Sequence, residues 1–418
     1  MAKKRSLPLI ESLHVRNYRA LQDVKLDLAP LTVLLGPNGS GKSTIFDVFA
    51  FLAECFTVGL RKACDNRGRF KELRSRGQTG PIVIEVGYRE PGFNKITYHL
   101  EIDEIKSVPV VKSEWLRWTR GKGGQPFKFL NFEMGEGKVV TGERPENEED
   151  RIEERLDGPS SLAVSTLGQF AINPRIVSLR QFIVGWGFYF LNPNEARNYQ
   201  ESGPQEKLSS TGSNLVNVIQ YLAESNPKLL IKIFDIISER VPCLRGFDLE
   251  VMPDNRALLS FKDATFKDSV SMMRASDGTL KMLQYLTVFH DPSPDRLIGI
   301  EEPENFLHPM LIAHMVEECR TVAGMAQVLV TTHSPFFLDG LRPEEVWVLH
   351  RNEEGYTEAQ RVSDMPEVLA MVGAGASLGH LWMENYISGA NPFDVVTKNR
   401  LAKLQGKISK GDQDAKKR

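Results

Sequence analysis

The sequence predicts an α/β protein with a mixed sheet, an antiparallel β subdomain and a helical insertion. Three observations support this fold class. The apolar run 31–35 has the length of a buried strand and is followed by a glycine-rich turn and an amphipathic helix over 43–56. Residues 82–102 alternate between apolar and polar, as antiparallel strands do. From residue 276 onward, predicted helices and strands alternate, which favours a parallel sheet.

The remaining elements follow in chain order. Residues 10–36 indicate strand, turn and strand. The segment 131–160 holds ten acidic and four basic residues, a local net charge of -6, and predicts a solvated insertion or a mobile loop. Two apolar stripes at helical spacing predict helices over 213–240, and strand-like alternation returns over 247–270.

Composition limits the class of function. The 418 residues exceed what one ordinary core serves, so we expect one large domain with insertions or two domains. With 41% hydrophobic and 25% charged residues, disorder as the main state is excluded. The formal net charge is only -2, so any contact with nucleic acid needs a local basic patch.

The same data predict a cytoplasmic protein without a membrane partner. No apolar run approaches the roughly 18 residues of a membrane-spanning helix. The N-terminal MAKKRSLPLIES is charged but lacks the apolar stretch of a secretory signal. The four cysteines show neither a CxxC pair nor zinc spacing, so we expect reduced thiols in the core.

Residues 36–43, with the sequence GPNGSGKS, fit the phosphate-binding pattern GxxxxGK[ST]. Glycines let successive N–H groups converge on an anion, and the following helix adds its positive N-terminal dipole. We expect Lys42 to reach the β- and γ-phosphates of a nucleotide and the Ser43 hydroxyl to bind Mg²⁺. Taken alone, the motif leaves a chance match as the alternative.

Two further predicted strands end in residues suited to nucleotide chemistry. The run 297–300 ends at Glu301 and Glu302, of which the first can hold Mg²⁺ and the second can orient or deprotonate a water molecule. The run 328–332 ends at His333, which can bond a γ-phosphate and sense its loss. Ligands bind at this edge of open parallel sheets. Taken singly, a solvated acidic turn and a structural histidine are the alternatives.

Ser276 and Gly278 precede a predicted helix over 280–289 and form a second anion-binding surface. One chain cannot easily wrap both anion sites around one γ-phosphate, whereas two chains facing head to tail can. The sequence therefore predicts a homo-oligomer that sandwiches the nucleotide between subunits.

The order of these four motifs resembles that of the ABC-type ATPase head. Their amino-acid sequences resemble those of the branch near the SMC, RecF, RecN and OLD proteins. The resemblance rests on the segments 14–20, 36–43, 276–279, 300–309 and 331–335. It implies an ABC-head fold with ATP and Mg²⁺ as ligands. The residues that it implies for nucleotide binding are Gly36, Pro37, Asn38, Gly39, Ser40, Gly41, Lys42, Ser43, Thr44, Ser276 and Gly278.

The resemblance also implies individual roles. Glu302 would be the catalytic base, His333 the γ-phosphate switch and Lys42 a third catalytic residue, while Ser43 and Glu301 would hold the metal. Asn305, just beyond the acids, falls in the segment that usually crosses the dimer interface, and Arg16 and Arg19 fall where related heads place basic residues near the nucleotide.

Two features depart from the pattern of related heads. The metal position commonly carries Asp, and Glu301 is one methylene longer, which predicts metal contact through water and slow turnover. The glutamine loop that couples the nucleotide to the insertion has no clear place, with Gln78 and Gln169 as candidates.

We expect four segments. Residues 1–110 form an N-terminal ATPase lobe with the phosphate loop, and 111–205 form an insertion of unknown role. Residues 206–345 form a C-terminal lobe with the signature motif at 276–279, the paired acids and the histidine motif, and 346–418 form a C-terminal extension with a frayed tail.

The resemblance implies an ATP-binding and ATP-hydrolysing switch that self-associates on Mg-ATP. Only about 70 residues follow Val346, too few for the nuclease domain that related OLD proteins carry. We therefore expect a separate effector, a nuclease or toxin, in anti-phage defence of the PARIS or Septu type. The alternative is a RecF-like DNA-maintenance ATPase that binds duplex DNA through the basic segment 61–76. A transporter ATPase subunit is a third, less favoured reading.

Overall fold

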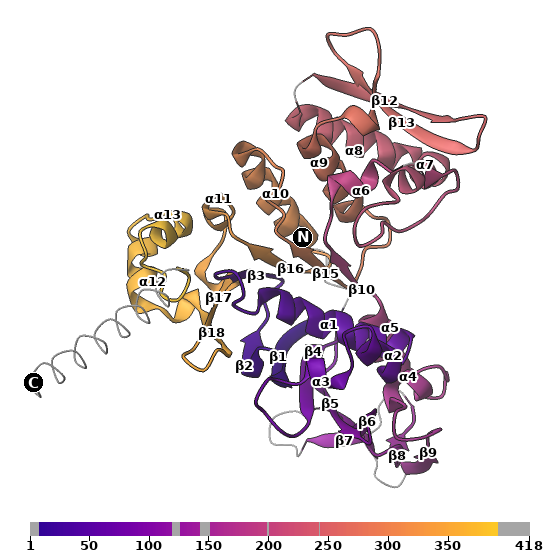
Figure 1. Ribbon diagram of the computed structural model, residues 1–418, viewed down its shortest axis with the longest axis vertical. Coiled ribbons are helices and arrows are strands. Elements are labelled where there is room, and N and C mark those ends of the chain that lie inside the picture. The colour runs from indigo at the N-terminus through magenta and orange to yellow at the C-terminus, as the bar shows by residue number, and fades with distance from the viewer. Residues whose placement is uncertain (1–7, 119–125, 143–150, 199, 242, 392–418) are drawn as a thin grey trace, which may run out of the picture.

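The computed structural model describes residues 8–118, 126–142, 151–198, 200–241 and 243–391. Two large sheets and one small sheet make up the molecule, with helices between and around them (Figure 1). One large sheet is antiparallel and the other is mainly parallel, so the predicted α/β class with a mixed sheet is confirmed. In the described part of the chain, no helix combines the length and apolar character needed to cross a bilayer.

The lobe at the bottom of Figure 1 is built on an eight-stranded antiparallel sheet in the order β2-β1-β4-β5-β6-β7-β8-β9. Successive side chains of β1 alternate between its faces, so Leu13 and Val15 enter the core while His14 lies opposite Glu85 on the polar face. The strands are β1 (Leu9–Tyr18), β2 (Leu21–Asp27), β4 (Ile82–Arg89), β5 (Lys95–Ile105), β6 (Val108–Trp118), β7 (Phe127–Glu133), β8 (Glu136–Val140) and β9 (Arg151–Arg155).

Five helices cover the apolar face of this sheet. The long helix α1 contributes Ile45, Phe49 and Leu52 to the shared core, all fully buried. These positions recur at helical spacing, which explains why the stripe read from the sequence faces inward. The helices are α1 (Lys42–Thr57), α2 (Leu60–Asp65), α3 (Phe70–Leu73), α4 (Ala163–Leu167) and α5 (Pro174–Val184).

The six-stranded sheet lies between two apolar cores. In β3, Leu34 joins the core shared with α1, whereas Val33 and Leu35 join a second core on the opposite face. The order is β10-β15-β16-β3-β17-β18, and every neighbouring pair is parallel except β17 with β18. The carboxyl ends of five strands therefore meet at one edge. The strands are β10 (Trp186–Tyr189), β15 (Leu297–Glu301), β16 (Gln327–Thr332), β3 (Leu31–Leu35), β17 (Val346–Arg351) and β18 (Thr357–Arg361).

The upper lobe covers the second core with helices and a small sheet. The predicted helices over 213–240 are confirmed as α7 (Leu215–Ser225) and α8 (Pro227–Arg240). The alternating region over 247–270 forms most of the small sheet, as predicted. The other elements are α6 (Pro193–Ala196), β11 (Gln200–Glu201), β12 (Leu244–Val251), β13 (Arg256–Asp263), β14 (Val270–Ser271), the 3₁₀ turn η2 (Met272–Arg274), α9 (Asp277–Phe289) and α10 (Pro309–Val322).

The C-terminal elements lie beside the six-stranded sheet, at the left of Figure 1. Gly379 allows a close approach here, because a Cβ on it would come 2.2 Å from the carbonyl oxygen of Pro335. The elements are α11 (Pro335–Leu338), η3 (Pro343–Glu345), η4 (Val362–Asp364), α12 (Pro366–Gly373) and α13 (Leu378–Met383). The predicted frayed tail lies outside the described residues.

Two expectations need correction. For the acidic segment 131–160, the mobile-loop alternative is wrong, since the described part supplies the end of β7 and all of β8 and β9. Residues 143–150 lie outside the described residues. All five residues of β9 are exposed, and charged side chains are tolerated on such an edge strand. Cys243 is exposed, whereas Cys55, Cys64 and Cys319 are buried as expected.

Candidate functional site

The phosphate loop leaves the carboxyl end of β3 and enters α1. Gly36, Gly39 and Gly41 have φ angles of 154°, 78° and 110°, which other residues rarely adopt. Gly36 lies so close to β17 that a Cβ on it would come 2.1 Å from the carbonyl oxygen of Leu349. The glycines thus let the loop curl tightly before α1, whose free N-terminal N–H groups attract anions.

Lys42 is folded back over the same loop. Its ammonium donates to the carbonyl oxygens of Gly36 at 2.7 Å and Pro37 at 3.1 Å. Burial lowers the pKa of Lys42 to about 8, although the carboxylates of Glu302, Glu301 and Glu304 oppose the shift. The side chain therefore stands between the loop and a group of acids.

The other predicted nucleotide-binding residues occupy different depths around the loop. Pro37 is half-buried and Asn38 is exposed. Ser40 is buried, and its hydroxyl has no hydrogen-bond partner within the described residues. Thr44 follows Ser43 on α1 and borders a hollow described below.

Ser43 and Glu301 are in direct contact, although they belong to distant parts of the chain. The Ser43 hydroxyl donates to Oε1 of Glu301 at the end of β15. A hydroxyl and one carboxylate are hard oxygen ligands, and Mg²⁺ usually takes few protein ligands and completes its shell with water and phosphate oxygens. The described residues hold no group of three or more His, Cys, Asp or Glu suited to a metal. This pair fits a Mg²⁺ ion that depends on a nucleotide for further ligands.

Glu302 lies beyond the end of β15 in a strained backbone conformation. Its φ is 45°, and its N–H donates to the carbonyl oxygen of Thr331 at 3.0 Å. Asn305 donates to its Oε2 at 2.8 Å, and Nε2 of His333 lies 3.4 Å from its Oε1. Burial and the nearby Lys42 lower the pKa of His333, which favours a neutral imidazole. The carboxylate is thus oriented by Asn305, and the His333 ring lies beside it.

Glu304 is a site residue to which the sequence assigned no role. Its Oε1 accepts from the backbone N–H of His333 at 2.6 Å and from the Thr332 hydroxyl at 2.9 Å. Burial raises the pKa of this carboxyl. Glu304 therefore fixes the end of β16 and positions His333. The only sequence signal was its place two residues after the paired acids.

The second anion-binding element lies against residues 302–308, the loop between β15 and α10 that we call the acidic loop. Ser276 caps α9, because its Oγ accepts from the N–H of Thr279 at 3.2 Å. Gly278 lies against the acidic loop, where a Cβ would come 3.1 Å from the carbonyl oxygen of Phe306. Within the described residues, the hydroxyl of Ser276 bonds only to Thr279 and makes no hydrogen bond to the phosphate loop. The structure thus gathers Lys42, Ser43, Glu301, Glu302 and His333 and leaves Ser276 and Gly278 apart.

A hollow of about 1000 Å³ borders Thr44 and is lined largely by polar and basic side chains. Arg19 is one of them, and it pairs with Asp47 of α1 at 2.9 Å. Arg16 is exposed on β1 and does not line this hollow. Gln78 does line it and donates to the Tyr356 hydroxyl at 3.0 Å.

The glutamine loop that related heads place near the nucleotide has no counterpart in glutamine here. The segment 190–194, which leaves β10 beside the paired acids, contains no glutamine. β10 pairs in parallel with β15, with Tyr189 opposite Ile300, so the chain leaves β10 at the same edge as Glu301. Gln78 lies instead beside Tyr356, and Gln169 donates to the backbone of Ser165. The sequence missed this segment because β10 has only four residues and carries no motif.

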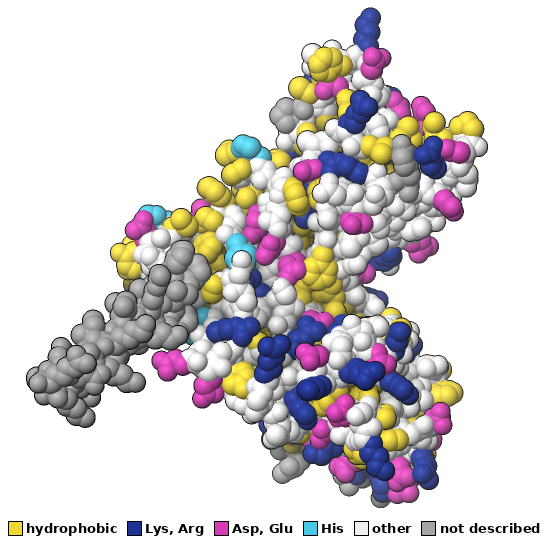
Figure 2. All heavy atoms as spheres, viewed as in Figure 1, with side chains coloured by type: hydrophobic (Ala, Val, Ile, Leu, Met, Phe, Trp, Pro, Cys, Tyr) yellow, Lys and Arg dark blue, Asp and Glu magenta, His cyan; other side chains and the backbone are white. Residues whose placement is uncertain are grey.

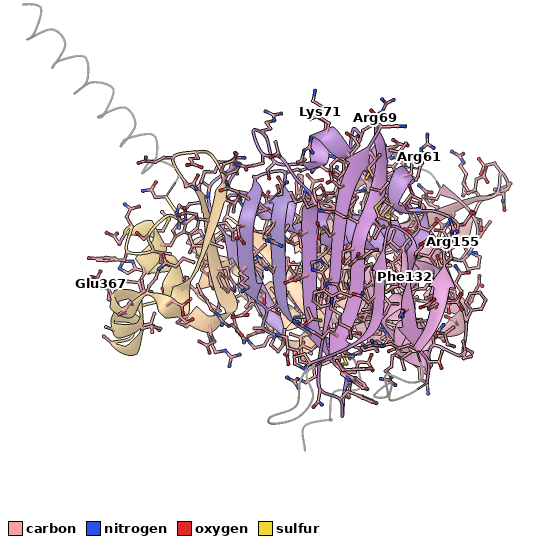
Figure 3. The ribbon with its side chains drawn as sticks, turned by 90° about the horizontal axis from the view of Figure 1, so that it is seen from below. Arg61, Arg69, Lys71, Phe132, Arg155 and Glu367 are labelled. Carbon is pink, nitrogen blue, oxygen red and sulfur yellow. The ribbon has the colours of Figure 1, made fainter. Side chains whose placement is uncertain are left out.

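The basic segment 61–76 contains one arginine that forms internal ion pairs and several cations that pair with no described acid. Arg67 pairs with Asp47 and Glu54 of α1, and its guanidinium lies 5.3 Å from the centre of the Phe51 ring. Arg61, Arg69 and Lys71 project from the molecular edge in Figure 3. Figure 2 shows Lys and Arg side chains gathered over this lobe. No described acid pairs with Arg61, Arg69, Lys71, Arg74 or Arg76.

Family models match most of the chain in two pieces. Residues 9–133 match the model described as "AAA ATPase domain". Residues 143–339 match the model described as "AAA domain, putative AbiEii toxin, Type IV TA system". The first match contains the phosphate loop, and the second contains the signature, paired-acid and histidine motifs.

Two curated relatives and one solved structure extend the comparison. The chain is 22% identical over 434 residues to the Septu protein PtuA of Bacillus mycoides (strain KBAB4), covering 96% of this chain and 50% of that protein. It is 51% identical over 37 residues to the OLD nuclease of Thermus scotoductus (strain ATCC 700910 / SA-01), covering 9% of this chain and 7% of that protein. The chain thus spans half or less of the curated relatives that it matches.

The fold matches the crystal structure of the SmcHead bound to the C-winged helix domain of ScpA. The TM-score is 0.51 with 13% identity, covering 85% of this chain and 99% of that chain. The predicted ABC-head fold is therefore confirmed. With the phosphate loop, the paired acids and both family matches, the chain is similar to P-loop ATPase domains of the branch that includes SMC heads and OLD proteins.

Proposed function

We propose that this chain binds and hydrolyses ATP in the presence of Mg²⁺ and acts as a nucleotide-dependent switch. The observation that carries the proposal is the contact between Ser43 and Glu301, with Glu302 and Lys42 beside it. It brings the phosphate loop and the paired acids to one edge of a parallel sheet, where ligands bind.

Each side chain has a role that follows from its position. Mg²⁺ held by Ser43 and Glu301 would neutralise charge on the phosphate oxygens. The ammonium of Lys42 would leave the carbonyl oxygens of Gly36 and Pro37 and donate to those phosphate oxygens instead. Glu302, oriented by Asn305, would accept a proton from the attacking water. His333 would bond the γ-phosphate with its Nε2, which has no hydrogen-bond partner in the described structure.

We propose that the nucleotide is sandwiched between two copies of the chain. Ser276 and Gly278 lie at the N-terminus of the 13-residue helix α9, beyond the acidic loop of their own chain. A second copy facing head to tail would bring its own α9 to the phosphate loop. Association would then depend on the γ-phosphate.

The biological setting that we propose is a cytoplasmic anti-phage system in which this switch controls a separate nuclease or toxin. The similarity to the Septu protein PtuA along 96% of the chain supports this proposal. The partner would bind one association state better than the other, since a switch transmits only differential affinity.

A second candidate is a RecF-like ATPase that binds duplex DNA itself. The specific support is the set of unpaired cations on α2, α3 and the following loop, which includes Arg69 and Arg76. If these residues contact phosphates, the double variant Arg69→Glu with Arg76→Glu should bind duplex DNA more weakly. The slope of log affinity against log salt concentration should also become shallower by about 1 per lost contact. Lys228→Glu, at an exposed position of α8, is the matched control, and an unchanged slope excludes this site. Arg67 is unsuitable because it serves an internal ion pair.

The direct test of the main proposal uses the purified chain and its Glu302→Gln variant. We expect the variant to bind Mg-ATP, to lose about 10²–10⁴-fold in hydrolysis and to remain in the associated state. Glu317→Gln, at an exposed position of α10, is the control. Hydrolysis by Glu302→Gln near the wild-type rate would show that Glu302 is not the catalytic base. If the molecular mass of the protein in solution is the same with and without ATP, the proposed switch is refuted. Capture of a stoichiometric nuclease or toxin by Glu302→Gln in native cells would support the defence role over DNA maintenance.

A further inference from the structure

A second lysine is buried near the acidic loop, and none of the roles above uses it. Lys281 lies on α9 and is 2% exposed. Its ammonium donates to the carbonyl oxygen of Leu191 at 2.5 Å. It also lies 5.2 Å from the centre of the Tyr285 ring and 5.7 Å from that of Phe306. Burying an ammonium is costly without such partners.

The groups around this ammonium come from three parts of the site. Leu191 belongs to the segment that leaves β10 beside Glu301. Phe306 belongs to the acidic loop and has a φ of 70°, a conformation rarely adopted by bulky residues. Lys281 itself lies on the helix that Ser276 caps. The Lys281 side chain thus connects α9 to the exit of β10 and to the acidic loop.

The charge of Lys281 responds to the acids of the site. Burial lowers the pKa of Lys281 to about 8, while Glu304 and Glu302 act in the opposite direction. A change in the charge around those carboxylates therefore changes the field at this ammonium. The apolar environment makes that field stronger than it would be in water.

Neighbouring bonds fasten the same segment to α9. Gln284, fully buried one turn after Lys281, donates to the carbonyl oxygens of Asn192 and Gly212, both at 3.3 Å. Arg197 donates to the carbonyl oxygen of Ala275 at 2.7 Å and pairs with Asp277 at 2.6 Å. The segment 191–197 and the start of α9 therefore form one hydrogen-bonded unit.

We propose that Lys281 is the positioning residue that couples the state of the paired-acid site to the orientation of α9, and hence to the presentation of Ser276 and Gly278. This inference rests on the proposed function, because it assumes that nucleotide binding changes the charge at Glu301 and Glu302. Phosphate and metal charges near those acids change the balance that holds the ammonium between Leu191 and Phe306. Helix α9 moves with the ammonium through its bonds to 191–197.

Hydrogen–deuterium exchange within a single chain tests the coupling. Saturating Mg-ATP is expected to change the exchange of amides in 191–197 and 277–284 of the wild-type chain. In Lys281→Met, which keeps the length and loses the charge, that change should fall at least threefold while Mg-ATP still binds. Lys281→Arg should restore the change, and Lys228→Met, at an exposed position of α8, should leave it intact.

The inference is overturned if Lys281→Met with bound Mg-ATP shows the wild-type change, or if Mg-ATP binds the wild type without altering either segment. Should Lys281→Met not fold, as judged by its thermal unfolding, Lys281→Gln provides the same comparison because it keeps a donor without the charge. A wild-type chain that shows the exchange change but neither hydrolyses ATP nor associates would refute the proposed function and leave this coupling intact.

Discussion

The hydroxyl of Ser43 donates a hydrogen bond to the carboxylate of Glu301, which lies 258 positions further along the chain. Ser43 is in the first turn of α1, and Glu301 is the last residue of β15. β16 lies between β15 and β3, so the contact spans a neighbouring strand. The sheet thus brings together two oxygen ligands that no local segment could supply.

The first prediction concerns this pair. Glu301→Gln removes the charge that a Mg²⁺ ion requires but keeps an oxygen near Ser43. We expect Mg²⁺-dependent ATP affinity to fall roughly 10- to 100-fold, the range typical of damage to a metal site. Titration of the chain with a fluorescent ATP analogue, with Mg²⁺ and with EDTA, measures the effect. Equal losses in both conditions would mean that Glu301 does not act through the metal.

The second prediction concerns pH. Without ligand, the pKa of Lys42 is lowered to about 8, and phosphate contact should raise it. Below this pKa the ammonium is already charged, whereas above it binding must take up a proton. ATP affinity should therefore fall by up to about tenfold per pH unit above pH 8. Calorimetry at pH 7 and pH 9 measures this dependence, and Lys42→Arg should flatten it. A flat wild-type profile would contradict the assignment.

The third prediction concerns Glu304. Glu304→Ala leaves the N–H of His333 and the hydroxyl of Thr332 without their acceptor. We expect a loss of about 1–3 kcal/mol in the free energy of unfolding. Glu304→Gln, which keeps one acceptor oxygen, should lose less. Urea denaturation measures both values, and equal stability of Glu304→Ala and wild type would show that this carboxylate does not hold the end of β16.

The fourth prediction separates the two roles of Ser276. Ser276→Ala removes the cap of α9 and should cost about 1 kcal/mol of stability, but it leaves the surface free for a second copy. Ser276→Arg adds bulk at that surface and should abolish Mg-ATP-driven association while the chain still binds nucleotide. Sedimentation measures the mass in each case. An associated Ser276→Arg variant would refute the contact between subunits.

Local chemistry made several elements predictable. The GxxxxGK[ST] spacing gives a turn, a helix start and a phosphate ligand within eight residues, because glycine freedom and helix capping act over one or two turns. The apolar stripes of α1, α7 and α8 predicted helices for the same local reason. Charge was a poorer guide over 131–160, since pairing of β8 with β7 and of β9 with β8 makes strands of segments whose composition favours a loop.

By itself, the sequence determined the phosphate loop, the order of the motifs and the residue types at the ends of β15 and β16. Only the tertiary structure decided which of those residues meet. In the tertiary structure Glu304 accepts a hydrogen bond from the backbone of His333, and Arg67 forms an internal ion pair with Asp47. The segment 190–194 lies beside the paired acids. The physical reason is that helices and turns depend on neighbours a few residues apart, whereas the order of strands in a parallel sheet depends on packing between segments hundreds of residues apart.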